Sequence, residues 1–202
     1  MPFAAVKIEE IVELHYIAPM KNVPSILEHG ILSHNRAAKL SHDDISMREI
    51  QDRRAKKQVP GGLELHDYAN LYFNGRNKMM AKRRPEQDRF CVLRVAQDAL
   101  NLSGAVIADQ NASSNYALFL PSPVGLQKLH REEIFVRSWK FPNDQIREWQ
   151  LGSLVCAELL VPHAVDPKLI RGAYVLDGAA LARFTDLKTN LECVINADIF
   201  LR

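Results

Sequence analysis

One glutamate in this sequence stands among apolar residues in a way that suggests chemistry. Glu158 is flanked by apolar runs at residues 155–157 and 159–161, which are of the types that folded proteins bury. A carboxylate in such a strand must be paired, hydrogen-bonded or turned toward a cleft, because burying it alone is costly. Glu158 is therefore either the outward residue of a half-exposed strand or a catalytic carboxylate at a sheet edge.

Two adjacent arginines form a second candidate group. Arg53 and Arg54 lie in residues 43–57, which favour a helix and end at the turn Pro60-Gly61-Gly62. An arginine pair of this kind either clamps a phosphate or faces solvent. Successive helical residues are turned by about 100°, so the two side chains cannot bind the same group. We expect Arg54 to be an exposed side chain that contributes within about 0.5 kcal/mol to stability.

A third candidate is the passage at residues 65–80, which combines aromatic, amide, basic and methionine side chains. Tyr72 lies beside Arg76 and Lys78, and base stacking with phosphate contact needs these residue types together. Basic residues crowd the same region and its continuation: Arg76, Lys78, Lys82, Arg83, Arg84, Arg89 and Arg94. They form either a solvated surface or a phosphate-binding face.

The rest of the composition excludes several classes of protein. The net charge is only +2, and no GxGxxG, P-loop, HExxH or GxSxG motif occurs. The three cysteines are widely spaced and show no zinc-ligand spacing, so we expect reduced, buried thiols and no metal. The first residues turn acidic too early for a signal peptide, and no apolar run is long enough to span a membrane. We expect a cytoplasmic monomer.

The order of predicted elements indicates an α+β fold in a single domain over residues 1–202. Alternating or apolar runs predict strands at 11–17, 68–73, 90–95, 105–108, 155–161 and 169–176, with residues 193–201 closing the sheet. Helices are predicted at 22–30, 43–57, 77–84 and around 139–149. In the first helix Asn22 is the expected N-cap and Gly30 the stop. No βαβ rhythm appears, so the sheet is expected to be antiparallel or mixed.

Taken together, these segments resemble the DarT family of DNA ADP-ribosyltransferase toxins. The similarity runs from about residue 13 to about residue 176 and follows one order along the chain. Its pieces are the strand and helix at 15–32, the segment 50–54, the turn 59–62, the passage 65–79 and the strand 157–162. Each piece is weak alone, and five in the right order are fairly specific.

The resemblance implies an ADP-ribosyltransferase-like fold, a split mixed β-sheet core with flanking helices and NAD as co-substrate in the cleft. Glu158 matches the catalytic glutamate of the family, and Arg54 matches an arginine implicated in catalysis. The resemblance also implies an NAD-binding group and a DNA-binding group. The first is His15, Tyr16, Asn22, Tyr72, Arg76 and Met79, and the second is Arg53, Lys78, Arg83 and Arg84.

The first strand departs from the family pattern. The family has Tyr-His where this chain has His15-Tyr16, and adjacent strand residues point to opposite faces. Either the strand slips by one residue or Tyr16 takes the place that faces nicotinamide. An arginine that the family carries shortly before the glutamate also lacks a match here, since Arg147 lies too far upstream.

The implied reaction makes sense of these residues. Cleavage of the bond between nicotinamide and ribose builds positive charge on the sugar, which a carboxylate at Glu158 would stabilise. Arg54 would bind the incoming base or the NAD phosphates, or assist proton removal. Nicotinamide leaves as a neutral group, so no metal is needed. A single-stranded substrate avoids the cost of unstacking the base, and both thymine and guanine remain open as acceptors.

Two alternatives remain on the sequence alone. A related transferase acting on RNA or protein fits the same fold, and a non-catalytic nucleic-acid-binding module fits the same basic face. NAD hydrolysis by the purified protein separates the enzyme from the binding module. The resemblance further implies a toxin-antitoxin system with a DarG-like macrodomain partner that removes ADP-ribose.

Overall fold

The computed structural model describes residues 4–44 and 46–201 and is built around one eight-stranded sheet. Its strand order is β10-β9-β4-β1-β3-β7-β5-β6. The strands are β10 (Cys193–Ile195), β9 (Ile170–Val175), β4 (Phe90–Ala96), β1 (Glu13–Pro19), β3 (Tyr68–Tyr72), β7 (Glu158–Pro162), β5 (Val106–Ala108) and β6 (Phe119–Pro121). Only β10 and β9 run parallel, so the mixed sheet of the expected α+β class is confirmed.

The sheet divides into two halves between β1 and β3. Strand β1 pairs with β4 along seven consecutive positions, whereas its pairing with β3 is reduced to one position, His15 opposite Tyr72. On the other side β3 pairs with β7 along five positions. The two half-sheets therefore diverge from a single point of contact, and this divergence opens the space in which the functional site lies.

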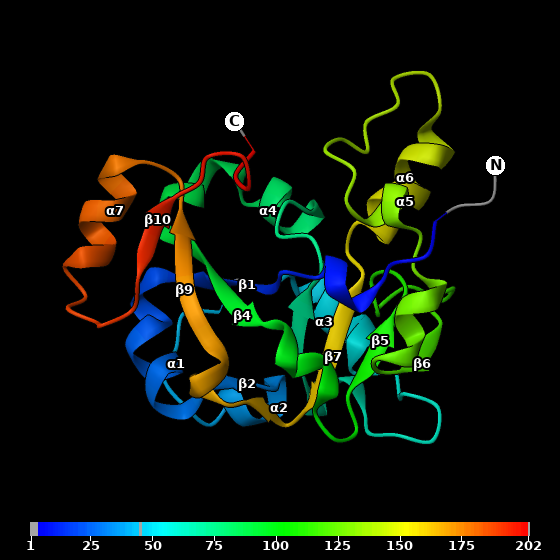
Figure 1. Ribbon diagram of the computed structural model, residues 1–202, viewed down its shortest axis with the longest axis horizontal. Coiled ribbons are helices and arrows are strands. Elements are labelled where there is room, and N and C mark those ends of the chain that lie inside the picture. The colour runs from blue at the N-terminus through cyan, green and yellow to red at the C-terminus, as the bar shows by residue number, and fades with distance from the viewer. Residues whose placement is uncertain (1–3, 45, 202) are drawn as a thin grey trace.

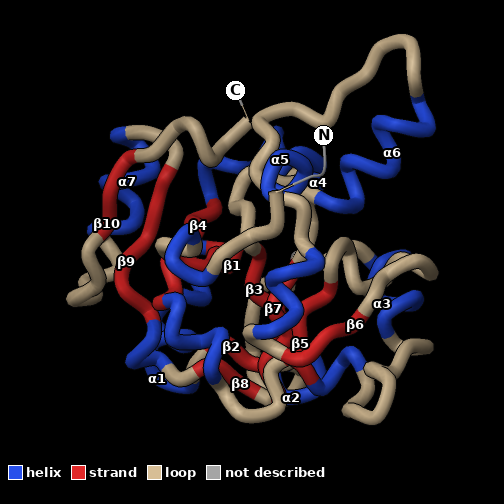
Figure 2. The backbone as a smooth tube through the Cα atoms, turned by 45° about the vertical axis from the view of Figure 1, so that its right-hand side comes forward, coloured by secondary structure: helices blue, strands red, loops and turns tan. Residues whose placement is uncertain are grey.

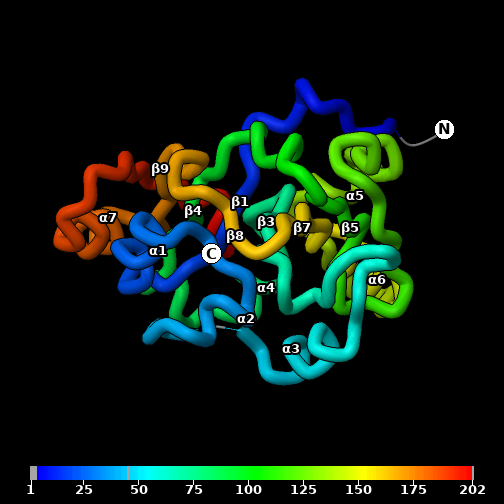
Figure 3. Tube along the Cα trace, turned by 90° about the horizontal axis from the view of Figure 1, so that it is seen from below, coloured from blue at the N-terminus to red at the C-terminus, as the bar shows by residue number. Residues whose placement is uncertain are grey.

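Helices cover the sheet at its ends and on one side. They are α1 (Val23–His29), α2 (His34–Ala37), α3 (Arg48–Arg54), α4 (Lys78–Lys82), α5 (Arg131–Ile134), α6 (Gln145–Leu154) and α7 (Gly178–Thr185). Helix α7 lies beside β9 and β10 at one end of the molecule, and α6 lies at the other (Figure 1). The loop before α6 stands out from the body (Figure 2). Seen from below, α3 lies on the opposite side from the N-terminal segment (Figure 3).

The core explains why the strands form where the apolar runs predict them. Strand β4 lies inside its half-sheet, between β9 and β1, and is buried along almost its whole length, as its mostly apolar residues favour. Strand β2 (Ile31–Leu32) directly follows α1 and pairs with β8 (Ala164–Val165) in a short two-stranded sheet. Gly30 makes that turn at φ +88, and a Cβ there would lie 2.3 Å from the Val165 carbonyl oxygen.

Several predicted boundaries are corrected by the structure. The helix expected at 43–57 spans only Arg48–Arg54, and Ile45 lies outside the described residues. The helix expected around 139–149 begins at Gln145, because Asp144 caps it by accepting the Arg147 amide hydrogen, while Trp139 is buried in the loop before it. The tail contributes β10 as an edge strand, and α7 was not predicted. None of the helices in the described ranges combines the length and apolarity that crossing a bilayer needs.

Candidate active site

A cavity of about 1070 Å³ lies at the split in the sheet. Its wall includes residues from β1, β3 and β7, from α3 and α4, and from α6 and the loop at 109–118. Ligand-binding cavities commonly measure about 300–1000 Å³, so this one has room for a large ligand or for two ligands side by side.

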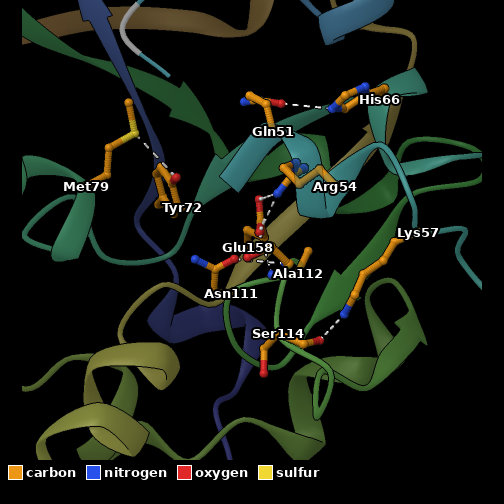
Figure 4. Close-up of polar contacts among 11 residues, drawn as sticks. Gln51, Arg54, Lys57, His66, Tyr72, Met79, Asn111, Ala112, Ser114 and Glu158 are labelled. Atoms are coloured by element: carbon orange, nitrogen blue, oxygen red, sulfur yellow. Dashed lines mark hydrogen bonds and ion pairs between the residues drawn. The ribbon is translucent and has the colours of Figure 1, made fainter. Parts of the chain in front are cut away.

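Glu158 lies at the floor of this cavity and is held from two sides. The residue is 1% exposed, and its Oε1 accepts hydrogen bonds from Arg54 Nη1 at 3.0 Å and from the Ala112 amide at 2.8 Å. Arg54 Nη1 also lies 3.3 Å from Oε2. Figure 4 shows Arg54 reaching down from α3 to the carboxylate on β7, with the loop of Ala112 on the other side. The carboxylate that the sequence places in an apolar strand is thus paired with an arginine and hydrogen-bonded to a backbone amide.

The sheet register fixes which side of β7 carries the carboxylate. Glu158 is opposite Tyr72 on β3 and opposite Ala108 on β5, and directly paired residues project from the same face. Glu158 and Tyr72 therefore share the face that the cavity opens on. The small side chain of Ala108 leaves room beside the carboxylate.

The expectation that Arg54 is exposed is wrong. Its side chain is only 7% exposed, because α3 lies over the cavity and turns its last residue inward toward Glu158. Arg53 is exposed, as the rotation of about 100° between successive helical residues requires, although it also lines the cavity. Within the described chain, no hydrogen bond joins the other guanidinium nitrogens of Arg54 to a protein atom, and Arg54 lines the cavity.

Of the two neighbouring residues on β1, it is Tyr16 that lines the cavity, although His15 is the one opposite Tyr72 in the sheet register. Tyr16 lines the cavity, and burial, followed by the negative charge of Asp44, raises its pKa to about 12. His15 does not line the cavity. Its Nε2 lies 3.4 Å from Glu13 Oε1, and its ring packs against Gly75. His15 therefore lies outside the cavity wall, and Tyr16 is the residue of the pair that is in place to meet a ligand.

Tyr72 and Met79 form one wall of the cavity together. The Tyr72 hydroxyl donates to the Met79 sulfur at 3.6 Å. Burial, then the nearby charge of Glu158, raises the pKa of Tyr72, so the phenol stays protonated. The ring thus presents a neutral aromatic face beside the carboxylate.

Asn22 lines the cavity and holds the predicted N-cap position of α1. Its side chain makes no capping hydrogen bond to α1. Instead its Nδ2 donates to the Asp43 carbonyl at 2.9 Å, and its Oδ1 accepts from the Asp43 amide at 3.0 Å. Asn22 therefore holds the backbone of the segment that leads into α3.

The basic cluster of residues 76–94 is not one face. Lys78 and Lys82 on α4 line the cavity, and burial lowers the pKa of Lys78. Lys78 packs against Gly152 of α6, where a Cβ would lie 2.1 Å from its Cε. Arg94 points elsewhere and pairs with Glu13 at 2.8 Å.

Three predicted ligand-binding arginines do not line the cavity. Arg76, expected to bind NAD, donates to the backbone carbonyls of Arg137, Asp198 and Phe200 at 2.8–3.0 Å and so ties the C-terminal segment down. Arg83 donates to the Ser46 carbonyl at 3.3 Å, and Arg84 is exposed at the start of a 3-10 helix. These three side chains lie outside the cavity wall, and their roles in binding NAD or DNA stay predictions.

The sequence also left functional residues unassigned in the loop at 109–118. The Ala112 amide binds Glu158, and Lys57 Nζ donates to the Ser114 carbonyl. Gln51 on α3 faces the cavity and contacts His66, 2.9 Å from Oε1 to Nε2. The loop was recognised as polar, but the group that contacts Glu158 is a backbone amide and no residue type signals it.

Metal ligands are not grouped anywhere in residues 4–44 and 46–201: no set of three or more His, Cys, Asp or Glu side chains lies close enough to hold an ion.

Comparisons with known proteins show which family and which relatives this sequence is similar to. The family model described as "ssDNA thymidine ADP-ribosyltransferase, DarT" matches residues 15–199. A DNA ADP-ribosyl transferase–DNA ADP-ribosyl glycohydrolase fusion protein of Thermosipho africanus (strain H17ap60334) is 29% identical over 195 residues. That alignment covers 91% of this chain and 46% of the relative, so the chain spans about half the length of the curated protein.

Two solved structures share the fold. Thermus sp. 2.9 DarT in complex with ADP-ribosylated single-stranded DNA gives a TM-score of 0.80 at 23% identity, covering 95% of this chain and 97% of that one. Thermosipho africanus DarTG in complex with ADP-ribose gives a TM-score of 0.78 at 24% identity, covering 94% of this chain and 51% of that one. With the family match extending over most of the sequence, the chain belongs to the DarT family of single-stranded DNA thymidine ADP-ribosyltransferases.

Proposed function

We propose that this chain transfers ADP-ribose from NAD to a thymine base of single-stranded DNA. The observation that carries the proposal is the buried carboxylate of Glu158, held by Arg54 and the Ala112 amide at the floor of the cavity. A preorganised negative group of this kind stabilises positive charge that develops beside it. The thymine acceptor follows the description of the family, and guanine is the alternative acceptor.

The cavity fits NAD in size and chemistry. Its volume of about 1070 Å³ exceeds what a drug-sized ligand needs, which leaves space for an acceptor nucleotide as well. Tyr16, Tyr72 and Met79 supply apolar and aromatic surface for flat rings, and the pKa of both tyrosines is raised, so neither adds charge. Relatives solved with NAD+ and with carba-NAD+ share the fold.

Each residue of the buried pair has a distinct task in this proposal. NAD supplies an ADP-ribosyl group whose ribose becomes positively charged as neutral nicotinamide leaves. Glu158 stabilises that charge and accepts a ribose hydroxyl hydrogen bond at Oε2, the oxygen with the longer Arg54 contact. Arg54 keeps the carboxylate oriented through Nη1, while its remaining N–H groups face the acceptor base or a phosphate.

The DNA side of the proposal depends on few cations. Arg53, Lys78 and Lys82 line the cavity, and none of the three forms an ion pair within the described chain. Bases of a duplex are stacked and shielded, so a single strand avoids the cost of extrusion. A relative of this fold was solved with ADP-ribosylated single-stranded DNA.

The expected result is labelling of single strands in a salt-sensitive manner. With about three phosphate contacts, the affinity should fall roughly tenfold to twentyfold between 50 and 200 mM salt, since each contact releases counterions. Duplex DNA of the same sequence should be labelled far less.

The test incubates the protein with NAD and four oligonucleotides, each lacking one base, and measures the gain in mass. Only the oligonucleotide without thymine should stay unlabelled, and loss of labelling in the guanine-free strand alone would move the acceptor to guanine. An RNA of matched sequence is the control for substrate class. Labelling of RNA but not DNA, or no NAD turnover at all, would contradict the proposal.

We further propose that the protein is the toxin of a toxin-antitoxin pair whose macrodomain partner removes ADP-ribose. The curated relative joins a DNA ADP-ribosyl transferase to a DNA ADP-ribosyl glycohydrolase in one chain, which supports a partner of that chemistry. Expression of the wild-type chain should stop growth, and co-expression of a DNA ADP-ribosyl glycohydrolase should restore it. Normal growth of cells whose DNA carries the label, without that enzyme, would oppose the toxin role.

The same proposal includes a domain organisation, an oligomeric state and a cellular compartment. Residues 1–202 are proposed to act as a single transferase domain and as a monomer in the cytoplasm, where NAD and DNA occur together. All three cysteines are free, which suits a reducing compartment. Gel filtration would show the monomer directly.

A further inference from the structure

Two large aromatic side chains at the mouth of the cavity have no part in the chemistry described so far. Tyr116 is 84% exposed in the loop at 109–118, and Trp149 is 59% exposed on α6. Both line the cavity, together with exposed Ile146. Exposed apolar side chains gathered at one site mark a surface that binds a ligand or a partner, because leaving them in water is unfavourable.

The support beneath Trp149 is well braced. Asp144 caps α6 through the Arg147 amide at 2.9 Å. Glu148 accepts from Lys140 Nζ at 2.6 Å with one oxygen and from the Phe141 amide at 3.3 Å with the other. The start of the helix that presents Trp149 is therefore fixed before any ligand arrives, which reduces the entropy lost on binding.

The support beneath Tyr116 connects the mouth to the reaction centre. Gln110 Nε2 donates to the Tyr116 carbonyl at 2.9 Å, and Gln110 Oε1 accepts from Ser153 Oγ of α6 at 2.8 Å. The same loop presents the Ala112 amide that binds Glu158. A ligand seated on Tyr116 is thus positioned by the loop that also holds the carboxylate.

The charges around the cavity favour a polyanion on this side. Lys78 and Lys82 on α4 line it without an ion pair within the described chain, whereas Lys140 before α6 lines it but is paired with Glu148. The acidic lining residues other than Glu158 are Asp43, Asp44 and Glu49, which come from the segment around the start of α3. Aromatic faces beside lysines are the combination that binds single-stranded nucleic acid.

We propose that Tyr116 and Trp149 form a stacking platform for the bases that flank the acceptor nucleotide, a role that rests on the proposed function. The acceptor base enters the cavity toward Glu158, and its neighbours stack on the two rings at the mouth. The platform reads no base identity, since every base has a π face. It lines up the strand and thereby lowers the KM for DNA.

The binding test uses the tryptophan itself as the probe. The chain has two tryptophans, and Trp139 is buried, so a Trp139→Phe variant leaves Trp149 as the sole emitter. Titration with a single-stranded oligonucleotide, without NAD, should quench its fluorescence. An abasic oligonucleotide of equal length carries the same phosphates and should quench little, which separates stacking from charge.

The kinetic test uses the otherwise native protein, so it stands even where Trp139→Phe fails to fold. Trp149→Ala and Tyr116→Ala should each raise the KM for the oligonucleotide about tenfold. Phe135→Ala is the matched control, since Phe135 is an aromatic residue 39% exposed outside this cavity, and its KM should stay unchanged. Removing the bases beside the acceptor should raise the KM of the wild-type protein for the oligonucleotide by the same factor. It should raise the KM of Trp149→Ala little further.

The outcomes separate the platform from the proposed function. If wild type labels DNA but the two variants keep a wild-type KM and Trp149 is not quenched, the platform is wrong and the patch belongs to a protein contact. If wild type labels no DNA, the proposed function fails, and the quenching titration still decides whether bases stack on Trp149. Equal quenching by abasic and normal strands would also overturn the platform.

Discussion

Replacing Glu158 by glutamine should lower the rate of transfer by at least about a hundredfold to a thousandfold, the cost of removing one preorganised electrostatic group. Glutamine keeps the shape of the side chain and an oxygen that accepts from the Ala112 amide. It removes the negative charge that stabilises the ribose. The loss should therefore appear in kcat, with the fold retained.

The measurement is single-turnover labelling of an oligonucleotide under saturating NAD, with circular dichroism to check folding. Glu132→Gln is the matched control, because Glu132 is exposed on α5 and does not line the cavity. A folded Glu158→Gln protein with near-normal labelling would remove Glu158 from the chemistry and leave the proposed reaction without its charge-stabilising carboxylate.

Replacing Arg54 by alanine should affect both activity and stability. The substitution leaves Glu158 buried beside an empty space, and breaking a buried ion pair from one side costs about 3 kcal/mol at the lower end of the usual range. For a chain of this size that lowers the melting temperature by roughly 6–12 °C. Transfer to DNA should fall as well, because the carboxylate loses its orientation and the acceptor loses the open N–H groups.

Arg53→Ala is the matched comparison, one residue away on the same helix. Its side chain is exposed, so its stability should change by no more than about 0.5 kcal/mol and its labelling should fall less. The double variant Arg54→Ala with Glu158→Gln should recover part of the lost stability, because the unpaired buried charge is gone. Thermal unfolding of the four proteins, assayed beside one oligonucleotide, decides this. An unstable Arg53→Ala with an intact Arg54→Ala would invert the assignment of the two arginines.

Local patterns predicted much of the fold because burial leaves a direct mark on sequence. The apolar runs that became β4 and β7 were recognisable, and so was the anomaly of Glu158 within the second. Helix α7 was missed, since its amphipathic pattern is short and its N-cap, Asp177, directly follows the strand predicted at 169–176.

The site was harder to predict because side-chain direction depends on contacts between distant segments. Arg54 was expected in water, and only the position of α3 over β7 shows that it is buried against a residue 104 positions away. Arg76 was expected at NAD, yet carbonyls near the C-terminus bind its guanidinium. Residue type indicated the chemistry in both cases, and tertiary packing decided where the group lies.

The backbone amide of Ala112 gives the reaction centre a hydrogen-bond donor that does not depend on the side chain at that position. Every residue except proline supplies the same N–H, so an alanine scan cannot detect its contribution, and the small residues that fit this fully buried position keep the donor. What must persist is the path of the backbone from Asn111 to Ser114, which hydrogen bonds to Ser153 and Lys57 maintain. The donor depends on this backbone path and not on a side chain, so a comparison of sequences position by position would overlook a group that contacts the Glu158 carboxylate directly.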